Sequence, residues 1–455
     1  MSEQTQEHFD LVVRAERAVV TGGAEPEPAA VGIRDGRVAA LLTGSAVAEA
    51  DEWTGREEVR LGPDEVLVPG FVDNHVHVNE PGRTEWEGFA TATRAAALGG
   101  VTTIIDMPLN SIPPTVDVDA LRVKQEAADG QCFVDVGFWG GAVPGHVGDL
   151  AALHEAGVFG FKCFLIDSGV PEFPPLEPEE FAEQLAEVAR LGALMIVHAE
   201  DPGDIAAAPD CHGGRYADFL ASRPRRSEER AIGQLLDGVR ATGARAHLLH
   251  LADGDAVPAL QEARAEGLPL TVETCPHYLT FTAEQIADGH TEFKCCPPIR
   301  EADSRDALWA ALADGTIDIV ASDHSPSEPS LKQLESGDFG TAWGGISGLQ
   351  VAVPAVWTGA AGRGHTLGDL VRWMSTRPAE LAGLGSKGEI AVGKDADLVA
   401  FAPDETWVVE PEQLRHKHRL TPYAGLELRG AVRSTWLRGV PVGERPAGRF
   451  LRRTT

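Results

Sequence analysis

The sequence lacks any run of about 18 consecutive apolar residues, the length that a membrane-spanning helix requires. Its N-terminus, MSEQTQEHFD, is polar and acidic, with no basic region followed by an apolar core, so no secretory signal is visible. Cysteine is scarce: there are 6 in 455 residues, none in a C-x-x-C spacing, and two of them are adjacent, Cys295 and Cys296. These absences exclude a disulfide scaffold, and we expect a reduced, cytoplasmic protein that does not bind a membrane.

Basic residues are also few. Lys and Arg total 39 against 69 Asp and Glu, which gives a formal net charge of −30. A chain with this balance does not attract nucleic acid or an anionic lipid surface through its overall charge, so we expect no nucleic-acid partner. The hydrophobic content of 43% and the charged content of 24% are those of an ordinary globular protein.

The middle of the chain contains eight short apolar or β-branched runs. They are Phe71–His77, Val101–Met107, Phe133–Gly141, Gly160–Leu165, Ala193–Glu200, Arg245–Leu251, Pro269–His277 and Ile317–His324. Near-continuous apolar runs of this length favour strands that are buried on both faces of a parallel sheet. Helical patterns lie between many of them, including Asp119–Ala128, Pro178–Leu191 and Glu228–Arg240, the last with Ser227 as the expected N-cap.

Strands that alternate with helices over about 255 residues predict an α/β fold, a (β/α)8 TIM barrel. A doubly wound open sheet is the alternative, but no G-x-G-x-x-G follows the first strand, and GLGSKG at 383–388 lacks the spacing of a phosphate-binding loop. Residues 9–68 and 390–443 instead alternate short β-like pieces with Gly and Pro turns, and neither end can build a core alone. We therefore expect a barrel at 68–389 and a small composite β domain formed by 1–67 and 390–455.

The sharpest chemical feature is Asp73-Asn-His75-Val-His77, at the end of the first predicted strand. Side chains two residues apart lie on the same face of a strand, so both imidazoles can reach one metal ion. An H-x-H pair alone is a weak signal, but further ligand-type residues recur at the ends of later strands. They are Lys162 in GFKCF, His198 in MIVHAE, His250 in HLLHL and Asp323 in VASDH. Barrel enzymes build their active sites at this rim, and the set is typical of a divalent metal site.

Lys162 is unusual in that set, because an ammonium group beside a metal ion is electrostatically unfavourable. One interpretation is a barrel lysine that forms an ion pair with a carboxylate. The other is that burial and nearby metal ions lower its pKa, so that the neutral amine adds carbon dioxide. The resulting carbamate has two oxygens and can bridge two metal ions about 3.5–4 Å apart.

The ordered set of D-x-H-x-H and strand-end Lys, His, His and Asp resembles the cyclic amidohydrolases of the amidohydrolase superfamily, which include dihydroorotases, hydantoinases, dihydropyrimidinases and allantoinases. The resemblance covers essentially the whole chain: VPGFVDNHVH precedes the first ligands, and GEIAVGKDADLV at 388–399 is similar to the family's returning C-terminal β segment. It implies a metal-bearing barrel with a composite β domain, and often a homotetramer.

The resemblance also implies a role for each ligand-type residue. His75, His77 and Asp323 would hold the more buried metal ion, His198 and His250 would hold the second, and carboxylated Lys162 would bridge both. We expect two divalent ions, with zinc first and cobalt, manganese or iron as alternatives. The implied mechanism is attack on a ring carbonyl by hydroxide that bridges the metals, with Asp323 as the catalytic general base and acid.

Substrate choice is indicated by the loops. Dihydroorotases carry H-x-H-x-R, whose arginine binds the substrate carboxylate, whereas Asn79 stands at that place here. HVNEPGR, WEGF, DMPLNSIPPT, CPHY, SDHSP and AWGGISGLQ instead resemble the allantoinase branch, which opens an uncharged hydantoin ring with a ureido tail. By this resemblance Asn110, Ser325 and Trp343 are candidate substrate contacts. Each has a structural alternative: a turn cap, a loop cap and a buried anchor, respectively.

Three further residues lie close to these motifs in the sequence. Cys296 stands where the resemblance predicts serine, in KCSPPIR, and its sulfur forms weaker hydrogen bonds. His277 and His324 could support the ligands from behind, and His324 fits a structural role better, because it points away from Asp323 on an extended strand. The alternatives to hydrolysis of allantoin are a hydantoinase- or dihydropyrimidinase-like activity and a non-catalytic scaffold, although relatives of that kind lose ligands and this chain has lost none.

Overall fold

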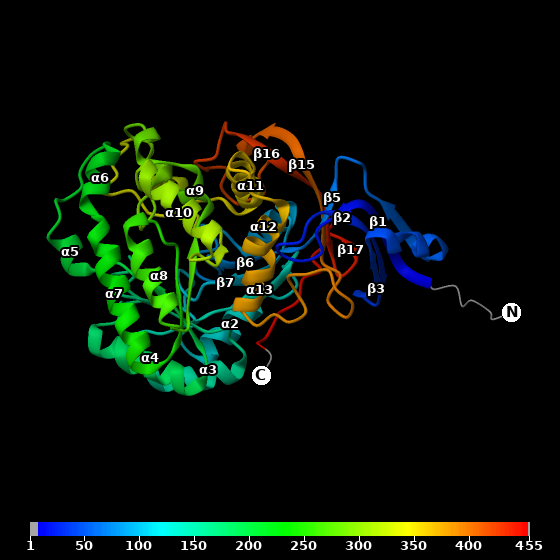
Figure 1. Cartoon of the computed structure of the whole chain (residues 1–455). Helices are drawn as coiled ribbons and strands as arrows, with labels where there is room; N and C mark the ends of the chain where they lie inside the picture. Colours follow the sequence, from blue (N-terminus) through cyan, green and yellow to red (C-terminus); the bar gives the residue numbers. More distant parts are fainter. Residues whose placement is uncertain (1–7, 454–455) are drawn as a thin grey trace.

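The computed structural model describes residues 8–453, and its larger part is a barrel of parallel strands (Figure 1). The barrel strands are β6 (Phe71–Val76), β7 (Val101–Asp106), β8 (Asp135–Phe138), β9 (Gly140–Gly141), β10 (Phe161–Phe164), β11 (Leu194–His198), β12 (Arg245–Leu248), β13 (Leu270–Thr274) and β14 (Ile319–Val320). Strands β8 and β9 share one position, since β8 pairs with β7 and β9 pairs with β10. A parallel bridge between Val76 and His324 joins the last strand to the first. The predicted TIM barrel is confirmed.

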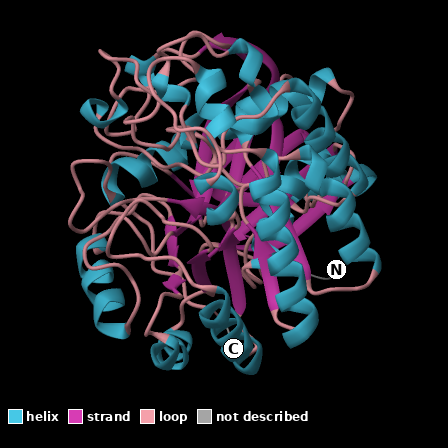
Figure 2. Cartoon of the chain, turned by 90° about the vertical axis from the view of Figure 1, so that its left-hand side faces the viewer, coloured by secondary structure: helices cyan, strands magenta, loops and turns pink. Residues whose placement is uncertain are grey.

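Helices surround these strands, as Figure 2 shows. They are α1 (Phe89–Leu98), α2 (Val118–Ala128), α3 (Leu150–Ala156), α4 (Pro178–Leu191), α5 (Pro202–Ala206), α6 (Tyr216–Ser222), α7 (Arg225–Thr242), α8 (Val257–Ala265), α9 (Pro276–Thr280), α10 (Ala302–Asp314), α11 (Ala352–Gly362), α12 (Leu367–Val371) and α13 (Arg377–Leu381). Every residue of β6, β7 and β11 is buried, because helices cover the outer face and side chains fill the inside.

Local sequence signals account for the ends of the best-predicted helix. Helix α4 begins with Pro178 in its first turn, Glu177 and Glu180 form a reciprocal capping box, and Gly192 ends it with a left-handed φ of 64°. The N-cap expected at Ser227 is wrong. Helix α7 begins at Arg225 after Pro224, and Ser227 is buried within its first turn. Proline at the N-cap position starts the helix without any side-chain cap bond, so the nearest serine was a misleading signal.

The two ends of the chain share a second sheet. Its strands are β1 (His8–Ala18), β2 (Glu27–Arg34), β3 (Arg37–Thr43), β4 (Thr54–Arg60), β5 (Val66–Pro69), β15 (Leu398–Val408), β16 (Glu427–Leu437) and β17 (Val440–Pro441). The order is β17-β16-β15-β5-β1-β2-β3, with β4 beside β1. The N-terminal and C-terminal segments meet where β5 pairs antiparallel with β15. The predicted composite β domain is therefore present, and its expected residues 1–7 and 454–455 lie outside the described part of the chain.

One piece of the C-terminal segment leaves this sheet and packs on the barrel. Between β15 and β16, the Lys417 backbone amide donates to the Glu87 carboxylate at 3.1 Å, and the Thr421 hydroxyl donates to the Ser347 carbonyl at 2.6 Å. These bonds attach residues 409–426 to loops at the carboxyl ends of the barrel strands. Within residues 8–453, no helix combines the length and the apolar character needed to cross a bilayer.

Candidate metal centre and active-site cavity

The nine residues predicted as site residues all line one cavity of about 410 Å³ at the carboxyl ends of the barrel strands. They are His75, His77, Asn110, Lys162, His198, His250, Asp323, Ser325 and Trp343. The ligand-type members come from different strands: β6, β10, β11 and the residues just after β12 and β14. The barrel topology thus brings together side chains that are up to about 250 positions apart in the sequence.

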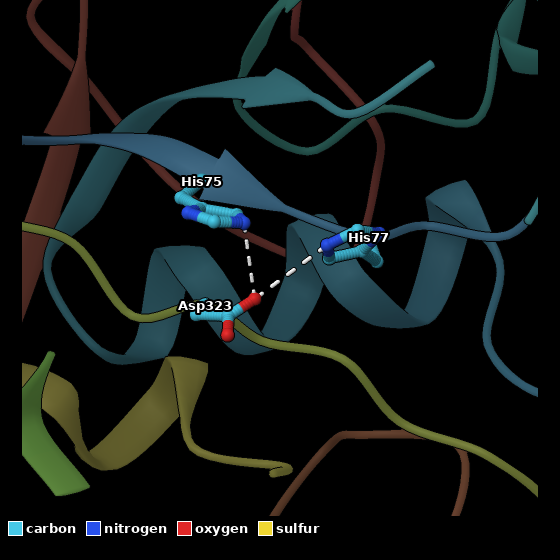
Figure 3. A group of neighbouring side chains, drawn as sticks. All are labelled: His75, His77 and Asp323. Atoms are coloured by element: carbon cyan, nitrogen blue, oxygen red, sulfur yellow. Dashed lines mark ion pairs between the residues drawn. The ribbon is translucent and has the colours of Figure 1, made fainter. Parts of the chain in front are cut away.

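His75, His77 and Asp323 form the tightest group in the cavity (Figure 3). Their ligand-type atoms lie within 4.8 Å of one another. Asp323 Oδ1 lies 3.1 Å from His75 Nε2 and 3.5 Å from His77 Nε2, so the three side chains point at a common position. All three are buried.

The backbone around this group adopts uncommon conformations. His250 has a φ of 38°, Asp323 has 43°, Asn79 has 66° and Asn110 has 64°. A non-glycine residue in this left-handed region costs on the order of 1–3 kcal/mol, and such strain gathers at functional sites. All four residues lie just after a barrel strand. The side chains of His250, Asp323 and Asn110 line the cavity, whereas that of Asn79 does not.

Several imidazole nitrogens are left without hydrogen bonds although they are buried. Within residues 8–453, His250 Nδ1 has no hydrogen-bond partner, and His75 Nε2 faces Asp323 Oδ1 without a well-aligned hydrogen bond. The opposite nitrogen of His75, Nδ1, lies 2.5 Å from Glu273 Oε1, and His198 Nε2 lies 2.8 Å from Glu200 Oε2. Carboxylates that hold one nitrogen in this way fix the ring orientation and leave the other nitrogen free for a metal ion.

The charges in the cavity also fit a cation. Burial lowers the pKa of His77 to about 3, and it lowers the pKa values of His198 and His250, so these rings are neutral donors at pH 7. Burial raises the pKa of Asp323, but His75 and the other rings outweigh it and hold the carboxylate ionised. Burial lowers the pKa of His75, but Asp323 and Glu273 outweigh it and raise the value to about 9. The group therefore favours one added positive charge, which a metal ion supplies.

Lys162 is almost fully buried and has no stable partner. Its exposed fraction is 1%, its ammonium lies 4.8 Å from the Phe164 ring centroid, and the ammonium forms no hydrogen bond or ion pair with another described residue. Burial lowers its pKa to about 8, although Asp323 and Glu273 act in the opposite direction. This environment does not match the simple interpretation of an ion-paired barrel lysine.

The three candidate substrate contacts differ in how much of each side chain is already in use. Asn110 Nδ2 lies 3.5 Å from His77 Nδ1. The Ser325 hydroxyl donates to the Asp323 carbonyl at 2.9 Å and accepts from the Ile346 amide at 3.2 Å, as a loop cap does. Trp343 is half-buried, and its ring packs edge-on against Trp86 with centroids 5.1 Å apart.

Cys296, His277 and His324 differ in their position relative to the cavity. Cys296 lines the cavity, whereas His277 and His324 do not. Both ring nitrogens of His277 are buried and lack a hydrogen-bond partner in the described part of the chain, and His277 forms another possible ligand group with Cys275 and Asp323. His324 Nε2 lies 3.2 Å from Glu87 Oε2, and its Nδ1 accepts from the Gly348 amide at 3.2 Å. These bonds agree with the structural role expected for His324.

Sequence analysis missed the carboxylates behind the ligands. Glu200 stands two residues after His198, and this spacing could have placed both on one face. Glu273 is a carboxylate within a buried strand, which by itself requires a partner. Arg223, which lines the cavity, donates to Glu200 at 2.6 and 2.9 Å. No local pattern identifies it, because its partner is 23 positions away.

Comparisons with known proteins agree with this geometry. The family model described as "Amidohydrolase family" matches residues 66–442. The allantoinase of Streptomyces avermitilis is 56% identical over 449 residues, which cover 98% of this chain and 99% of that one. The allantoinase of Saccharomyces cerevisiae is 45% identical over 436 residues, which cover 94% of each chain. Among solved structures, L-hydantoinase (dihydropyrimidinase) from Arthrobacter aurescens superposes with a TM-score of 0.90 at 30% identity and covers 98% of this chain and 100% of its own.

Proposed function

This chain belongs to the amidohydrolase family, and from that membership we propose that it hydrolyses the cyclic amide of allantoin to the acyclic ureido acid allantoate. The observation that carries the proposal is the convergence of six ligand-type side chains in one cavity. The family implies a metal centre, and the tight group of His75, His77 and Asp323 is a candidate for it.

The charge on the cavity wall supports an uncharged substrate. Asn79 occupies the position at which dihydroorotases have an arginine, and the cations that line the cavity are already engaged. Arg223 is paired with Glu200, and the Lys294 ammonium donates to the Phe339 and Ala342 carbonyls at 2.5 and 2.6 Å. A substrate carboxylate would find no free cation there apart from Lys162, so the cavity suits a neutral ring with donors and acceptors.

The finer metal assignment is part of this proposal. His75, His77 and Asp323 would hold one divalent ion and His198 and His250 a second, with zinc the first expectation. Lys162 would bridge them as a carbamate: its neutral amine forms an N–C bond to carbon dioxide and loses one proton. Burial supports this step, because a pKa of about 8 gives far more neutral amine at pH 7 than an ordinary lysine has. When bound, the two ions acidify water and polarise a carbonyl oxygen.

The chain's own residues would move the proton. Asp323 Oδ1 faces His75 and His77, which leaves Oδ2 to accept a proton from the attacking water. The water oxygen bonds to the ring carbonyl carbon, the ring C–N bond breaks, and Asp323 returns the proton to the departing nitrogen. General acid–base assistance of this kind contributes about 10²–10⁴-fold. Asn110, Ser325 and Trp343 would contact the substrate from the cavity wall.

The organisation of the chain follows the same family expectation. We propose 68–389 as the catalytic barrel and 1–67 with 390–455 as the composite β domain, although β5 spans the first boundary and residues 409–426 pack on the barrel. A homotetramer and a cytoplasmic location are further predictions from the family resemblance. We expect the binding partner to be a small molecule, which agrees with a cavity of about 410 Å³.

A substrate panel tests the proposed activity. Zinc-reconstituted protein is assayed with allantoin, hydantoin, dihydrouracil and dihydroorotate, and the ureido acid product is identified. We expect kcat/KM for allantoin to exceed the others by at least about tenfold, since a difference of about 1.4 kcal/mol in transition-state binding is enough. Preference for hydantoin or dihydrouracil would instead support the hydantoinase-like activity. A protein that binds no metal and turns over none of the four would indicate the scaffold alternative.

A further inference from the structure

Arg83 connects three of the loops that surround the cavity without lining the cavity itself. It lies between β6 and α1, and its side chain is 16% exposed. Its Nη1 donates to the Asn110 carbonyl, in the loop after β7, at 2.8 Å. The same nitrogen lies 2.5 Å from Glu172 Oε1, in the loop after β10. One guanidinium therefore holds two neighbouring loops to its own by charge-assisted hydrogen bonds.

A stack of side chains extends this connection to a fourth loop. The Arg83 guanidinium carbon lies 5.2 Å from the Trp86 ring centroid, and Trp86 packs edge-on against Trp343, in the loop after β14. Trp343 lines the cavity and approaches Gly169, where an added Cβ would lie 3.4 Å from its ring. Trp86 is 7% exposed, so it supports Trp343 from behind rather than facing the substrate.

Both cavity residues at the ends of these connections depend on outside support. Asn110 has a left-handed φ of 64°, and the bond from Arg83 to its carbonyl fixes the orientation of that peptide. Trp343 is half-buried, packs on the hydrophobic cluster that includes Phe164 and Phe173, and meets the edge of Trp86 on another side. Without Arg83, the Glu172 carboxylate and the Asn110 carbonyl both lose a charged donor, and this loss favours a rearrangement of the loops.

We propose that Arg83 is a positioning residue for substrate binding: through Asn110 and the pair of Trp86 and Trp343, it sets the wall of the cavity that faces the ring substrate. This inference rests on the proposed function. Arg83 itself touches none of the ligand-type residues, and its nearest link to them is the long 3.5 Å approach of Asn110 Nδ2 to His77 Nδ1, so its effect falls on substrate affinity rather than on metal content.

The test compares Arg83→Met, Arg83→Lys and Glu172→Gln with Arg94→Met as a matched control. Arg94 also lies over an aromatic ring, 5.6 Å from the Phe133 centroid, and also pairs with a glutamate, but it lies on the exposed surface of α1. Steady-state kinetics give kcat and KM for allantoin, metal content is measured on each variant, and hydrogen–deuterium exchange follows peptides that contain residues 107–117 and 342–346.

Arg83→Met should raise KM by about 10- to 100-fold, the effect of losing hydrogen bonds to a charged group, with kcat within about threefold. Arg83→Lys should recover part of the affinity, because an ammonium can still reach Glu172 but cannot stack as well on Trp86. Glu172→Gln should give a smaller rise in KM. In a variant that combines Arg83→Met with Glu172→Gln, the rise in KM should be smaller than the product of the two single rises, because the two side chains share one interaction. Hydrogen–deuterium exchange should rise in both peptides of Arg83→Met, whereas its metal content should match that of the wild type. Arg94→Met should match the wild type in KM, metal content and exchange.

Two results would overturn the inference: an unchanged KM in Arg83→Met with normal exchange, or a parallel loss of kcat and metal. If Arg83→Met fails to fold, Glu172→Gln and Arg83→Lys carry the same comparison. If the wild type hydrolyses hydantoin but not allantoin, the proposed function fails, and the KM comparison is made with hydantoin. The exchange measurement needs no substrate, so it tests the role of Arg83 independently of the proposed function.

Discussion

Two buried groups of charged side chains lie at opposite ends of the barrel strands. The cavity cluster, at the carboxyl ends, consists of His75, His77, Lys162, His198, His250 and Asp323. The joint cluster, at the start of β8 where the β domain meets the barrel, consists of Asp135, Lys387, Asp395, Asp397 and Arg438. Both clusters are largely removed from water, yet their polar atoms are used in different ways.

In the joint cluster every charged side chain has an oppositely charged partner. The Lys387 ammonium lies 2.6 Å from Asp135, 2.7 Å from Asp397 and 3.1 Å from Asp395. Asp135 also accepts from Arg438 at 2.6 Å. Burial lowers the pKa of Lys387, but its three carboxylate neighbours outweigh burial and raise it.

In the cavity cluster, by contrast, His250 Nδ1 has no hydrogen-bond partner and the Lys162 ammonium has no ion pair within residues 8–453, while His75 Nε2 and His77 Nε2 both face the same oxygen of Asp323. A fully paired buried cluster belongs to the joint between the two parts of the fold. A buried cluster whose ligand-type atoms are not all paired with one another can instead bind a metal ion. The difference agrees with the general contrast between the two ends of a TIM barrel, of which one contributes stability and the other catalysis.

Lys162→Ala gives the largest expected effect on activity. Loss of the bridging ligand should lower metal content below two ions per chain and reduce kcat/KM by about 10³-fold, since each metal contributes several kcal/mol of transition-state stabilisation. Denaturant unfolding of the metal-free protein should change little, and short carboxylic acids should restore part of the turnover. Inductively coupled plasma mass spectrometry measures the metal content, and steady-state kinetics measure kcat/KM and its rescue. A variant that keeps two metal ions and full turnover would refute the carbamate bridge.

Lys387→Met should show the opposite pattern. Removing this cation leaves Asp135, Asp395 and Asp397 buried without their common partner, which should reduce the free energy of unfolding by about 3–5 kcal/mol. Lys394→Met is the matched control, because Lys394 is more exposed, forms its ion pair with Glu389 and otherwise donates only a long bond to the Lys387 backbone carbonyl, so it should change stability by less than about 1 kcal/mol. Urea unfolding measures both variants. Metal content and kcat of the folded Lys387→Met protein should equal the wild type, and a loss of metal would contradict the separation of the two clusters.

Glu273→Gln tests whether the carboxylates behind the ligands tune the cavity cluster. Glu273 holds His75 Nδ1 at 2.5 Å and His247 Nε2 at 3.0 Å, and a neutral amide cannot stabilise these rings in the same way. Metal affinity should fall about 10- to 100-fold, with activity regained at excess zinc. Chelator competition measures the affinity. Glu187→Gln, at an exposed pair on α4, should leave it unchanged, and an equal effect of both variants would count against the assignment.

The pH dependence of reconstitution gives the smallest and most specific effect. Only the neutral amine of Lys162 can add carbon dioxide, so at fixed dissolved carbon dioxide the reactivation rate of metal-free protein should rise about tenfold per pH unit and level off above the pKa of about 8. An ordinary lysine would keep accelerating beyond pH 10. Stopped-time assays of recovered activity give the profile, and a rate still rising at pH 10 would show that burial does not lower this pKa.

The barrel and the ligand-type residues could be predicted because both depend on short-range patterns. Buried strands are continuous apolar runs, and His75 and His77 lie on one face by the period of two. Strand β4 carries no such pattern, because TGREEVR is charged and its pairing with β1 is a long-range contact. The β-domain piece at 409–426 contacts Glu87, more than 300 positions earlier, and no local signal predicts that contact.

The support of the site was equally hidden. Arg83 could be seen in the motif HVNEPGR, but its bonds to Asn110 and Glu172 depend on how three loops fold over one another. The same holds for Arg223 and Glu200. The sequence predicts which residues converge on the cavity, whereas the residues that orient them are determined by tertiary contacts between loops.

Zinc titration of the metal-free protein, with allantoin turnover as the signal, tests the central claim most directly. If the cavity cluster holds two metal ions and a carbamate, turnover should rise until two zinc ions are bound per chain, with bicarbonate present, and then stay constant. Full allantoin turnover at zero metal, or two bound zinc ions with no allantoin turnover, would contradict it.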